Sequence, residues 1–174
     1  LYAEAWDELM ELAELLEAPV MTTMQGKSVF PENHALALGA ATVSKTKQTA
    51  HFIGEADVIF GVGCSMTVTG YCISIPPDKI IIHNSTNPAD INKDVRADFP
   101  LLGDDKLVLR DMIDQIKVKT DGKGRHSEVD VRNEVAKIKK EWLDEWMPQL
   151  TSDEVPMNQY RIIWDMFHYV DSAI

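Results

Sequence analysis

The stretch that decides the fold is Pro19 to His34, PVMTTMQGKSVFPENH. It begins with a short apolar run, continues with two threonines and ends in a turn around Gly26. A buried strand that ends in this way brings backbone N–H groups and hydroxyls to its carboxyl end, where open α/β sheets bind their ligands. The stretch therefore predicts a strand over residues 20–23 with a nucleotide cleft at its end.

The flanking sequence predicts that strands and helices alternate. Apolar residues at spacings of three and four predict a helix ahead of Pro19; they are Trp6, Leu9, Met10, Ala13 and Leu16. Further strands are predicted at 57–63, 79–83 and 97–101, with helices over 47–56 and after Asp104 or Asp105. Continuous apolar strands of this kind predict an α/β fold, a parallel sheet with helices on both faces, over residues 1–118.

A second region follows this α/β part. The polar run from Thr120 to Arg125 contains two glycines and marks a boundary. Beyond it, apolar periodicity predicts two helices, at 128–147 and 159–170, with Asn158 as the cap of the second. Residues 119–174 are therefore expected to form a helical C-terminal tail.

Composition excludes several classes of partner. The formal net charge of −11 argues against nucleic acid, whose phosphates require a basic face. No apolar run approaches the roughly 18 residues that cross a bilayer, so no membrane partner is expected. The two cysteines, Cys64 and Cys72, give no disulfide framework, and a cytoplasmic location is expected.

Two glycine motifs are incomplete. The GKS at Gly26 lacks the glycine that a phosphate loop needs five positions earlier, where Met21 stands. Gly61 and Gly63 begin a dinucleotide fingerprint, but Met66 stands in place of its third glycine. A tight turn at the end of the strand explains Gly61 and Gly63 at least as well as a ligand contact does.

The polar residues have structural explanations of their own. His34, His51 and His83 show no metal-ligand spacing with the cysteines, so no metal site and no catalytic constellation is expected. Asp104 and Asp105 fit an N-cap pair, and turn chemistry accounts for the polar run 84–87. The residues alone indicate an α/β domain with a nucleotide cleft.

Four segments, taken in order, resemble a known family. They are ELAELLEAPVMTTMQGKSVFPENHALALG, GEADVIFGVGCSM, KIIIHNSTNPADINKDV and FPLLGDDKLVL, within about residues 3–118. Together they resemble the central domain of thiamine-diphosphate-dependent enzymes of the acetolactate synthase and benzoylformate decarboxylase group. The resemblance implies a Rossmann-like, DHS-like NAD/FAD-binding fold that lacks its opening strand, and a tail that leads into the diphosphate-binding domain.

The resemblance also implies a function. The parent would be a thiamine-diphosphate-dependent and Mg²⁺-dependent lyase or transferase, acting on a 2-oxo acid as a decarboxylase, a carboligase or both. Flanking domains would hold both cofactors, and the parent would be a homo-oligomer, a dimer or tetramer. This domain would carry no catalytic residue. The alternative is a stand-alone regulatory module that binds an adenine nucleotide.

The cleft residues carried over by position come from three strand ends. They are Thr23, Met24 and Gly26; Gly63, Cys64 and Ser65; and Ser85, Asp90 and Asp104. Relatives bind FAD, or ADP, or nothing in this cleft. Flavin-binding members have an arginine at the position of Ser65 and acidic residues at those of Ser85 and Asn87. Loss of the arginine removes a bidentate donor, which favours an ADP-like or degenerate cleft over tight FAD binding.

Overall fold

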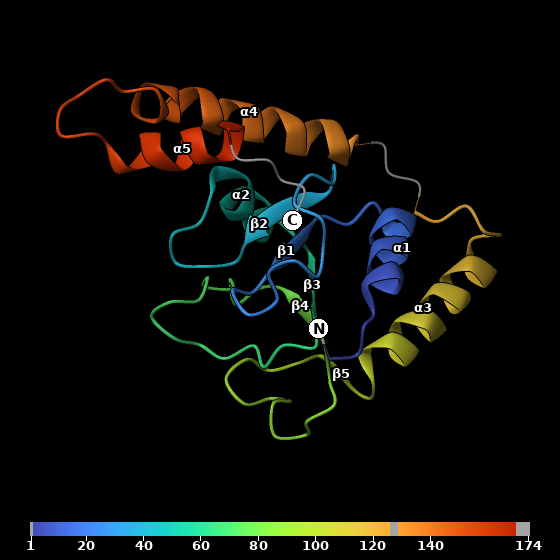
Figure 1. The fold of residues 1–174 in the computed structure, drawn as a ribbon. Coiled ribbons are helices and arrows are strands. Elements are labelled where there is room, and N and C mark those ends of the chain that lie inside the picture. Colours follow the sequence, from blue (N-terminus) through green and yellow to red (C-terminus); the bar gives the residue numbers. More distant parts are fainter. Residues whose placement is uncertain (1, 126–128, 170–174) are drawn as a thin grey trace.

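The structure is a computed structural model that describes residues 2–125 and 129–169. Its helices are α1 (Trp6–Leu16), α2 (Lys47–Glu55), α3 (Asp105–Lys119), α4 (Val131–Leu150) and α5 (Gln159–Tyr169). Its strands are β1 (Val20–Thr22), β2 (Ala37–Ala40), β3 (Val58–Val62), β4 (Ile80–Ser85) and β5 (Phe99–Leu102). The order along the chain is α1-β1-β2-α2-β3-β4-β5-α3, and α4 and α5 follow (Figure 1).

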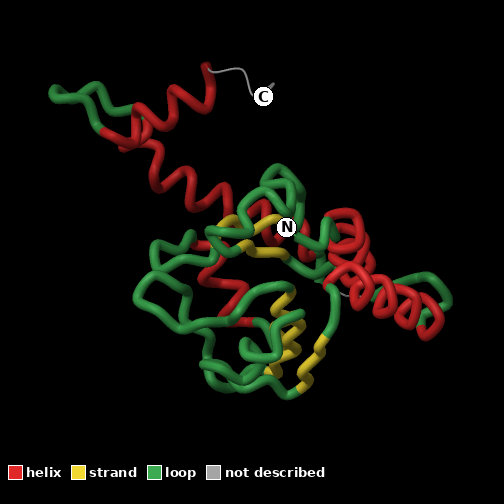
Figure 2. The backbone as a smooth tube through the Cα atoms, turned by 60° about the horizontal axis from the view of Figure 1, so that its bottom comes forward, coloured by secondary structure: helices red, strands yellow, loops and turns green. Residues whose placement is uncertain are grey.

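All the strand pairs within the described residues are parallel, and they form two sheets. β1 pairs with β2, whereas β3, β4 and β5 form a second sheet in that order. In the second sheet Phe60 pairs with Ile82, and Ile82 pairs with Phe99. The tube view shows the strands at the centre with helices around them (Figure 2). The predicted α/β, Rossmann-like class is confirmed.

Two clusters of buried side chains form the core, and α1 belongs to both. The first cluster joins Ala13 of α1 to Leu36 and Leu38 around β2. The second joins Leu12 of α1 to Leu109 and Ile113 of α3. The helix thus lies across the two sheets, as expected for an amphipathic helix that covers a parallel sheet.

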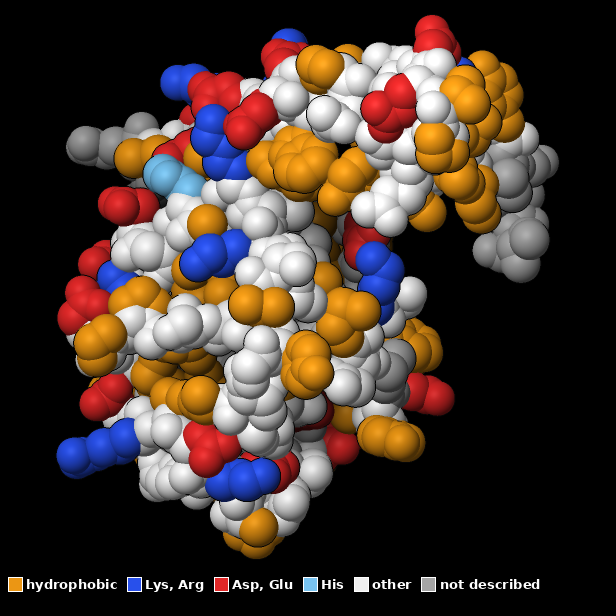
Figure 3. Space-filling view, turned by 90° about the vertical axis from the view of Figure 1, so that its left-hand side faces the viewer, with side chains coloured by type: hydrophobic (Ala, Val, Ile, Leu, Met, Phe, Trp, Pro, Cys, Tyr) orange, Lys and Arg blue, Asp and Glu red, His pale blue; other side chains and the backbone are white. Residues whose placement is uncertain are grey.

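The tail divides into a packed part and an exposed part. Val131 and Val135 of α4 are buried in the first cluster. α5 has no buried residue and packs on α4, with Tyr160 in edge contact with Trp146. The hairpin of α4 and α5 lies at the top of the molecule, where apolar side chains gather on its surface (Figure 3). Residues 128 and 170, in the predicted helix ranges, lie outside the described residues.

Two details differ from the prediction. The strand β2 was not expected, because ALGA contains no β-branched residue and one glycine, a composition that is weak for strands. One sheet was expected, and the structure has two, because no backbone pairing joins β1 to β3. None of the described helices combines the length and the apolar character needed to cross a membrane.

Candidate functional site

The carboxyl ends of β3 and β4 meet the start of α3, and Gly63, Asn84 and Asp105 come together there. Gly63 follows β3 with φ +57°, and its N–H donates to the Asn84 carbonyl at 3.1 Å. The Asn84 side-chain amide donates to Asp105 Oδ1 at 2.6 Å. A Cβ at position 63 would overlap the Asp105 carboxylate. Glycine is therefore required here both for its backbone angle and for the space that it leaves.

This cluster includes a partly buried ionisable group, the Asp105 carboxyl. Burial raises the pKa of the Asp105 carboxyl, the hydrogen bond from Asn84 opposes this, and the charge of Asp104 adds to it. Asn84 is fully buried, and its Oδ1 has no hydrogen-bond partner within the described residues. This oxygen is the natural acceptor for a donor from a water or a ligand.

Asp104 occupies the start of α3 with its own carboxylate. Its Oδ1 accepts from the N–H groups of Lys106 at 3.0 Å and Leu107 at 3.2 Å. A helix N-terminus binds phosphate through such free N–H groups. Here a carboxylate from the chain itself satisfies two of them, and Asp105 adds a second carboxyl beside it. This arrangement makes the start of α3 a poor binding site for a phosphate.

Ser85 and Asp90 bind each other. The Ser85 hydroxyl donates to Asp90 Oδ2 at 3.1 Å and accepts from the Asn87 N–H at 3.1 Å. Ser85 is buried and Asp90 is half-buried. The pair closes the turn after β4, as the polar run 84–87 predicted.

His83 fixes the turn after β3. Its Nε2 lies 2.7 Å from the Cys64 carbonyl oxygen, so Nε2 carries the proton and donates it. Nδ1 is buried with no partner within the described residues. Burial raises the pKa of the Cys64 thiol, which makes it a poor nucleophile. The next residue, Ser65, shares a hydrogen bond of 2.7 Å with Thr67.

The loop after β1 lies apart from the other predicted cleft residues. Thr23 and Met24 are exposed, and Thr23 Oγ1 accepts from the Gly26 N–H at 3.0 Å. No hydrogen bond between described residues joins this loop to the ends of β3 and β4. The structure therefore gathers six of the nine predicted cleft residues around β3, β4 and α3, namely Gly63, Cys64, Ser65, Ser85, Asp90 and Asp104.

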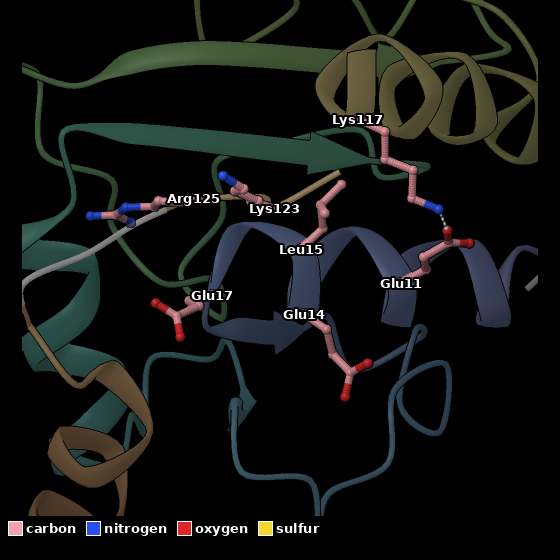
Figure 4. A pocket seen from close by; sticks show the side chains of 7 residues that line it. All are labelled: Glu11, Glu14, Leu15, Glu17, Lys117, Lys123 and Arg125. Carbon is pink, nitrogen blue, oxygen red and sulfur yellow. Dashed lines mark hydrogen bonds and ion pairs between the residues drawn. The ribbon is translucent and has the colours of Figure 1, made fainter. Parts of the chain in front are cut away.

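Two cavities of about 370 Å³ each lie elsewhere. The first is lined by Glu11, Glu14, Leu15, Glu17, Lys117, Lys123 and Arg125. Figure 4 shows Lys117 of α3 bonded to Glu11 of α1, whereas the Glu14 carboxylate points away from Lys117, Lys123 and Arg125. The second is lined by residues 152–155, Met157 and Arg161. None of the nine predicted cleft residues lines either cavity.

The described residues do not fit a magnesium site. No group of three or more His, Cys, Asp or Glu side chains among them is placed to hold a metal ion. Mg²⁺ is held by carboxylate and phosphate oxygens in octahedral geometry. The acidic side chains near α3 are instead bonded to amides and hydroxyls of the chain.

Comparison with known proteins identifies the family. A family model described as "Thiamine pyrophosphate enzyme, central domain" matches residues 1–112. The chain belongs to this family. The probable acetolactate synthase large subunit of Methanocaldococcus jannaschii is 34% identical over 169 residues, which are 96% of this chain and 27% of the relative. Its counterpart in Methanococcus aeolicus is 33% identical over 98% of this chain and 29% of that protein.

A solved structure supports the same family. Benzoylformate decarboxylase from Polynucleobacter necessarius aligns with a TM-score of 0.57 and 25% identity, over 74% of this chain and 23% of that chain. The chain thus spans less than a third of the length of the relatives that it matches.

Sequence reasoning missed the roles of Asn84 and Asp105. Both were explained as turn and cap residues, and neither was placed in the cleft. Their contact joins residues 21 positions apart. One signal was available in the sequence. A short polar run beginning at Asn84 ends an apolar strand, and side chains at the carboxyl ends of parallel strands lie on the edge where helices begin.

Proposed function

We propose that this chain is the central, non-catalytic domain of a thiamine-diphosphate-dependent enzyme that acts on a 2-oxo acid. The observation that carries the proposal is the family match over residues 1–112 together with two relatives named as probable acetolactate synthase large subunits. The parent would decarboxylate its substrate, join two substrates, or do both. Its other domains would hold thiamine diphosphate and Mg²⁺, and the cofactor would supply the carbon chemistry.

The proposal divides the chain by role. Residues 1–118 would be the central domain, and residues 119–174 would lead toward the diphosphate-binding domain. The exposed apolar face of α5 supports this, since Ile163 and Phe167 are 65% and 84% exposed. A helix that is apolar on several sides is normally buried. The flanking domains, and further copies in a homo-oligomer, would cover it.

A nucleotide role at the ends of β3 and β4 is the second candidate. The unsatisfied Asn84 Oδ1 favours a ligand that donates hydrogen bonds. The carboxyls of Asp104 and Asp105 disfavour a diphosphate beside α3. We therefore propose that FAD or ADP binds weakly or not at all. Isothermal titration with ADP and with FAD tests this, and micromolar affinity for either would contradict it.

The main proposal is tested by an activity comparison. The 174-residue chain and the longer polypeptide that contains it are incubated with pyruvate, thiamine diphosphate and Mg²⁺, and CO₂ release is measured. We expect release from the longer protein alone, and only with thiamine diphosphate. Turnover by the 174-residue chain, or a longer protein whose activity ignores the cofactor, would contradict the proposal.

A further inference from the structure

The cavity between α1 and the turn after α3 is lined by charged side chains that are only partly paired. Its volume is about 370 Å³, and six of its seven lining residues are charged. Lys117 donates to Glu11, and His34 lies 3.2 Å from the Glu14 carboxylate. The other three charged lining residues form no ion pair and no side-chain hydrogen bond with another described residue. They are Glu17, Lys123 and Arg125.

Backbone contacts hold the two walls of this cavity in place. The Arg125 N–H donates to the Leu15 carbonyl oxygen, near the end of α1, at 2.8 Å. A Cβ on Gly124 would overlap the same carbonyl oxygen, and the Gly124 N–H donates to Thr120 Oγ1 at 3.1 Å. The turn after α3 is therefore fixed against α1, and the cavity is formed without a ligand. A preformed cavity lowers the entropy cost of binding.

The wall at the end of α1 favours a positively charged group. Glu17 is the C-cap of α1, and the last turn of this helix contains no basic residue. The C-terminal end of a helix carries a partial negative charge and is stabilised by cations. The Glu17 carboxylate adds a full negative charge at this end, and no described cation pairs with it. An ammonium group is the partner that this wall lacks.

The facing wall favours a carboxylate. Lys123 and Arg125 are exposed, and both line the cavity. Figure 4 shows their side chains above the end of α1, with the Glu17 carboxylate below Arg125. A guanidinium binds a carboxylate through two parallel hydrogen bonds, and a lysine ammonium beside it adds a further donor group. Because neither cation pairs with a described residue, both are available to a ligand.

We propose that this cavity binds a free α-amino acid. The ammonium group of the ligand contacts Glu17, and its carboxylate contacts Lys123 and Arg125. A small apolar side chain packs on Leu15, the one uncharged residue of the lining. The lining holds three carboxylates and three cations, so a ligand without net charge fits it. None of the nine predicted cleft residues lines this cavity, so the amino-acid site is separate from the proposed function.

Ligands with a single charge fit the cavity less well. A simple carboxylate meets the carboxylates of α1 and the negative end of its helix dipole. A simple amine meets the three cations of the lining. Like charges that lie close together repel each other. A molecule that carries both charges places each one against its partner, so the loss of either charge weakens binding.

Amide NMR of the 174-residue chain tests the proposal with L-alanine and two matched probes. Propionate lacks the amino group of alanine, and ethylamine lacks its carboxylate. We expect L-alanine to shift the Gly124 and Arg125 amide signals saturably at millimolar concentration, and both other probes to bind at least about tenfold more weakly. Absence of a saturable shift with L-alanine would overturn the proposal. Equal binding of propionate or of ethylamine would also overturn it, because the cavity would then be a site for a single charge.

Substitutions identify the groups that bind the ligand. Arg125→Gln and Glu17→Gln should each weaken L-alanine binding at least about tenfold, because each removes one charged contact. Lys119→Gln and Glu55→Gln are matched controls, since both residues are exposed, lie outside the cavity lining and form no ion pair with a described residue. We expect the controls to bind L-alanine as the unmodified chain does. Equal weakening in cavity and control variants, or unchanged binding in either cavity variant, would overturn the proposal.

Discussion

Asp105 shows how one side chain decides the character of the candidate cleft. Its carboxyl touches Gly63, accepts from the buried Asn84 amide and stands next to Asp104 at the start of α3. The groups that would hold a phosphate in other α/β proteins are here bonded to carboxylates of the chain itself. The candidate cleft therefore favours a ligand that donates hydrogen bonds over a ligand that carries negative charge.

The raised pKa of Asp105 predicts a pH-dependent stability. A carboxyl whose folded pKa lies above its unfolded value favours the folded state at low pH, and this contribution is lost as pH rises through the folded pKa. Asp105→Asn should therefore give a higher Tm than the unmodified chain at pH 7, with a difference that vanishes toward about pH 3. Thermal unfolding followed by circular dichroism measures this. A constant difference across that range would contradict the assignment.

The turn after α3 contains two glycines, Gly122 and Gly124, whose replacement by alanine should cost different amounts of stability. Both Gly124 and Gly122 have positive φ, +69° and +76°. A Cβ at 124 would overlap the Leu15 carbonyl oxygen at the end of α1, whereas a Cβ at 122 meets open space. Gly122→Ala should cost about 1 kcal/mol of unfolding free energy from its backbone angle, and Gly124→Ala about 2 kcal/mol more. Urea unfolding compares them, and equal losses would contradict the close approach.

At the scale of elements, α1 and α3 are joined by charges as well as by packing. Arg110 of α3 donates to Glu11 at 2.7 Å and to Glu8 at 3.1 Å, and Lys117 also donates to Glu11. Hydrogen bonds from Lys117 and then Arg110 lower the pKa of Glu11. The network therefore holds α1 against α3.

A lowered pKa gives stability that is present above the unfolded pKa and lost as pH falls through the folded value. Glu11→Gln should therefore reduce stability by about 0.5–1 kcal/mol at pH 7, and by progressively less as pH falls through the folded pKa of Glu11. Asp111→Asn is the control, because no ion pair joins Asp111 to another described residue. An equal loss for both substitutions would show that the bridge contributes nothing.

α4 belongs to the core, while α5 has no buried residue among those that the structure describes. Val135 is fully buried against residues around β2, and Ile163 of α5 is 65% exposed. Val135→Ala should cost about 2 kcal/mol through lost contacts and a cavity, and Ile163→Ala should change stability by less than about 0.5 kcal/mol. Chemical denaturation of both variants measures this. Similar losses would mean that α5 is packed in solution.

The sequence predicted elements well where their periodicity was continuous, as in DVIFGVG and the helix ending at Leu16. It failed at β2, whose alanines and glycine carry no strand preference and which pairs only because β1 lies beside it. The cleft followed a similar rule. Ser85 and Asp104 were placed in the cleft by their position in the family resemblance, whereas the Asn84–Asp105 contact depends on how β4 meets α3.

At the scale of the whole molecule, the chain combines membership of a known family, two separate parallel sheets and an exposed helix, α5. The family match covers residues 1–112, and the relatives are more than three times as long as this chain. The apolar side chains that α5 exposes form a surface of the kind that another polypeptide covers.

The coding DNA on both sides of this segment tests the central claim most directly. We predict one continuous reading frame, with a pyrimidine-binding domain and its cofactor-activating glutamate upstream, and a Gly-Asp-Gly…Asn magnesium motif downstream. A start codon next to Leu1 and a stop codon after Ile174 would contradict the claim. The ends of β3 and β4 would then become the leading functional site of a stand-alone module.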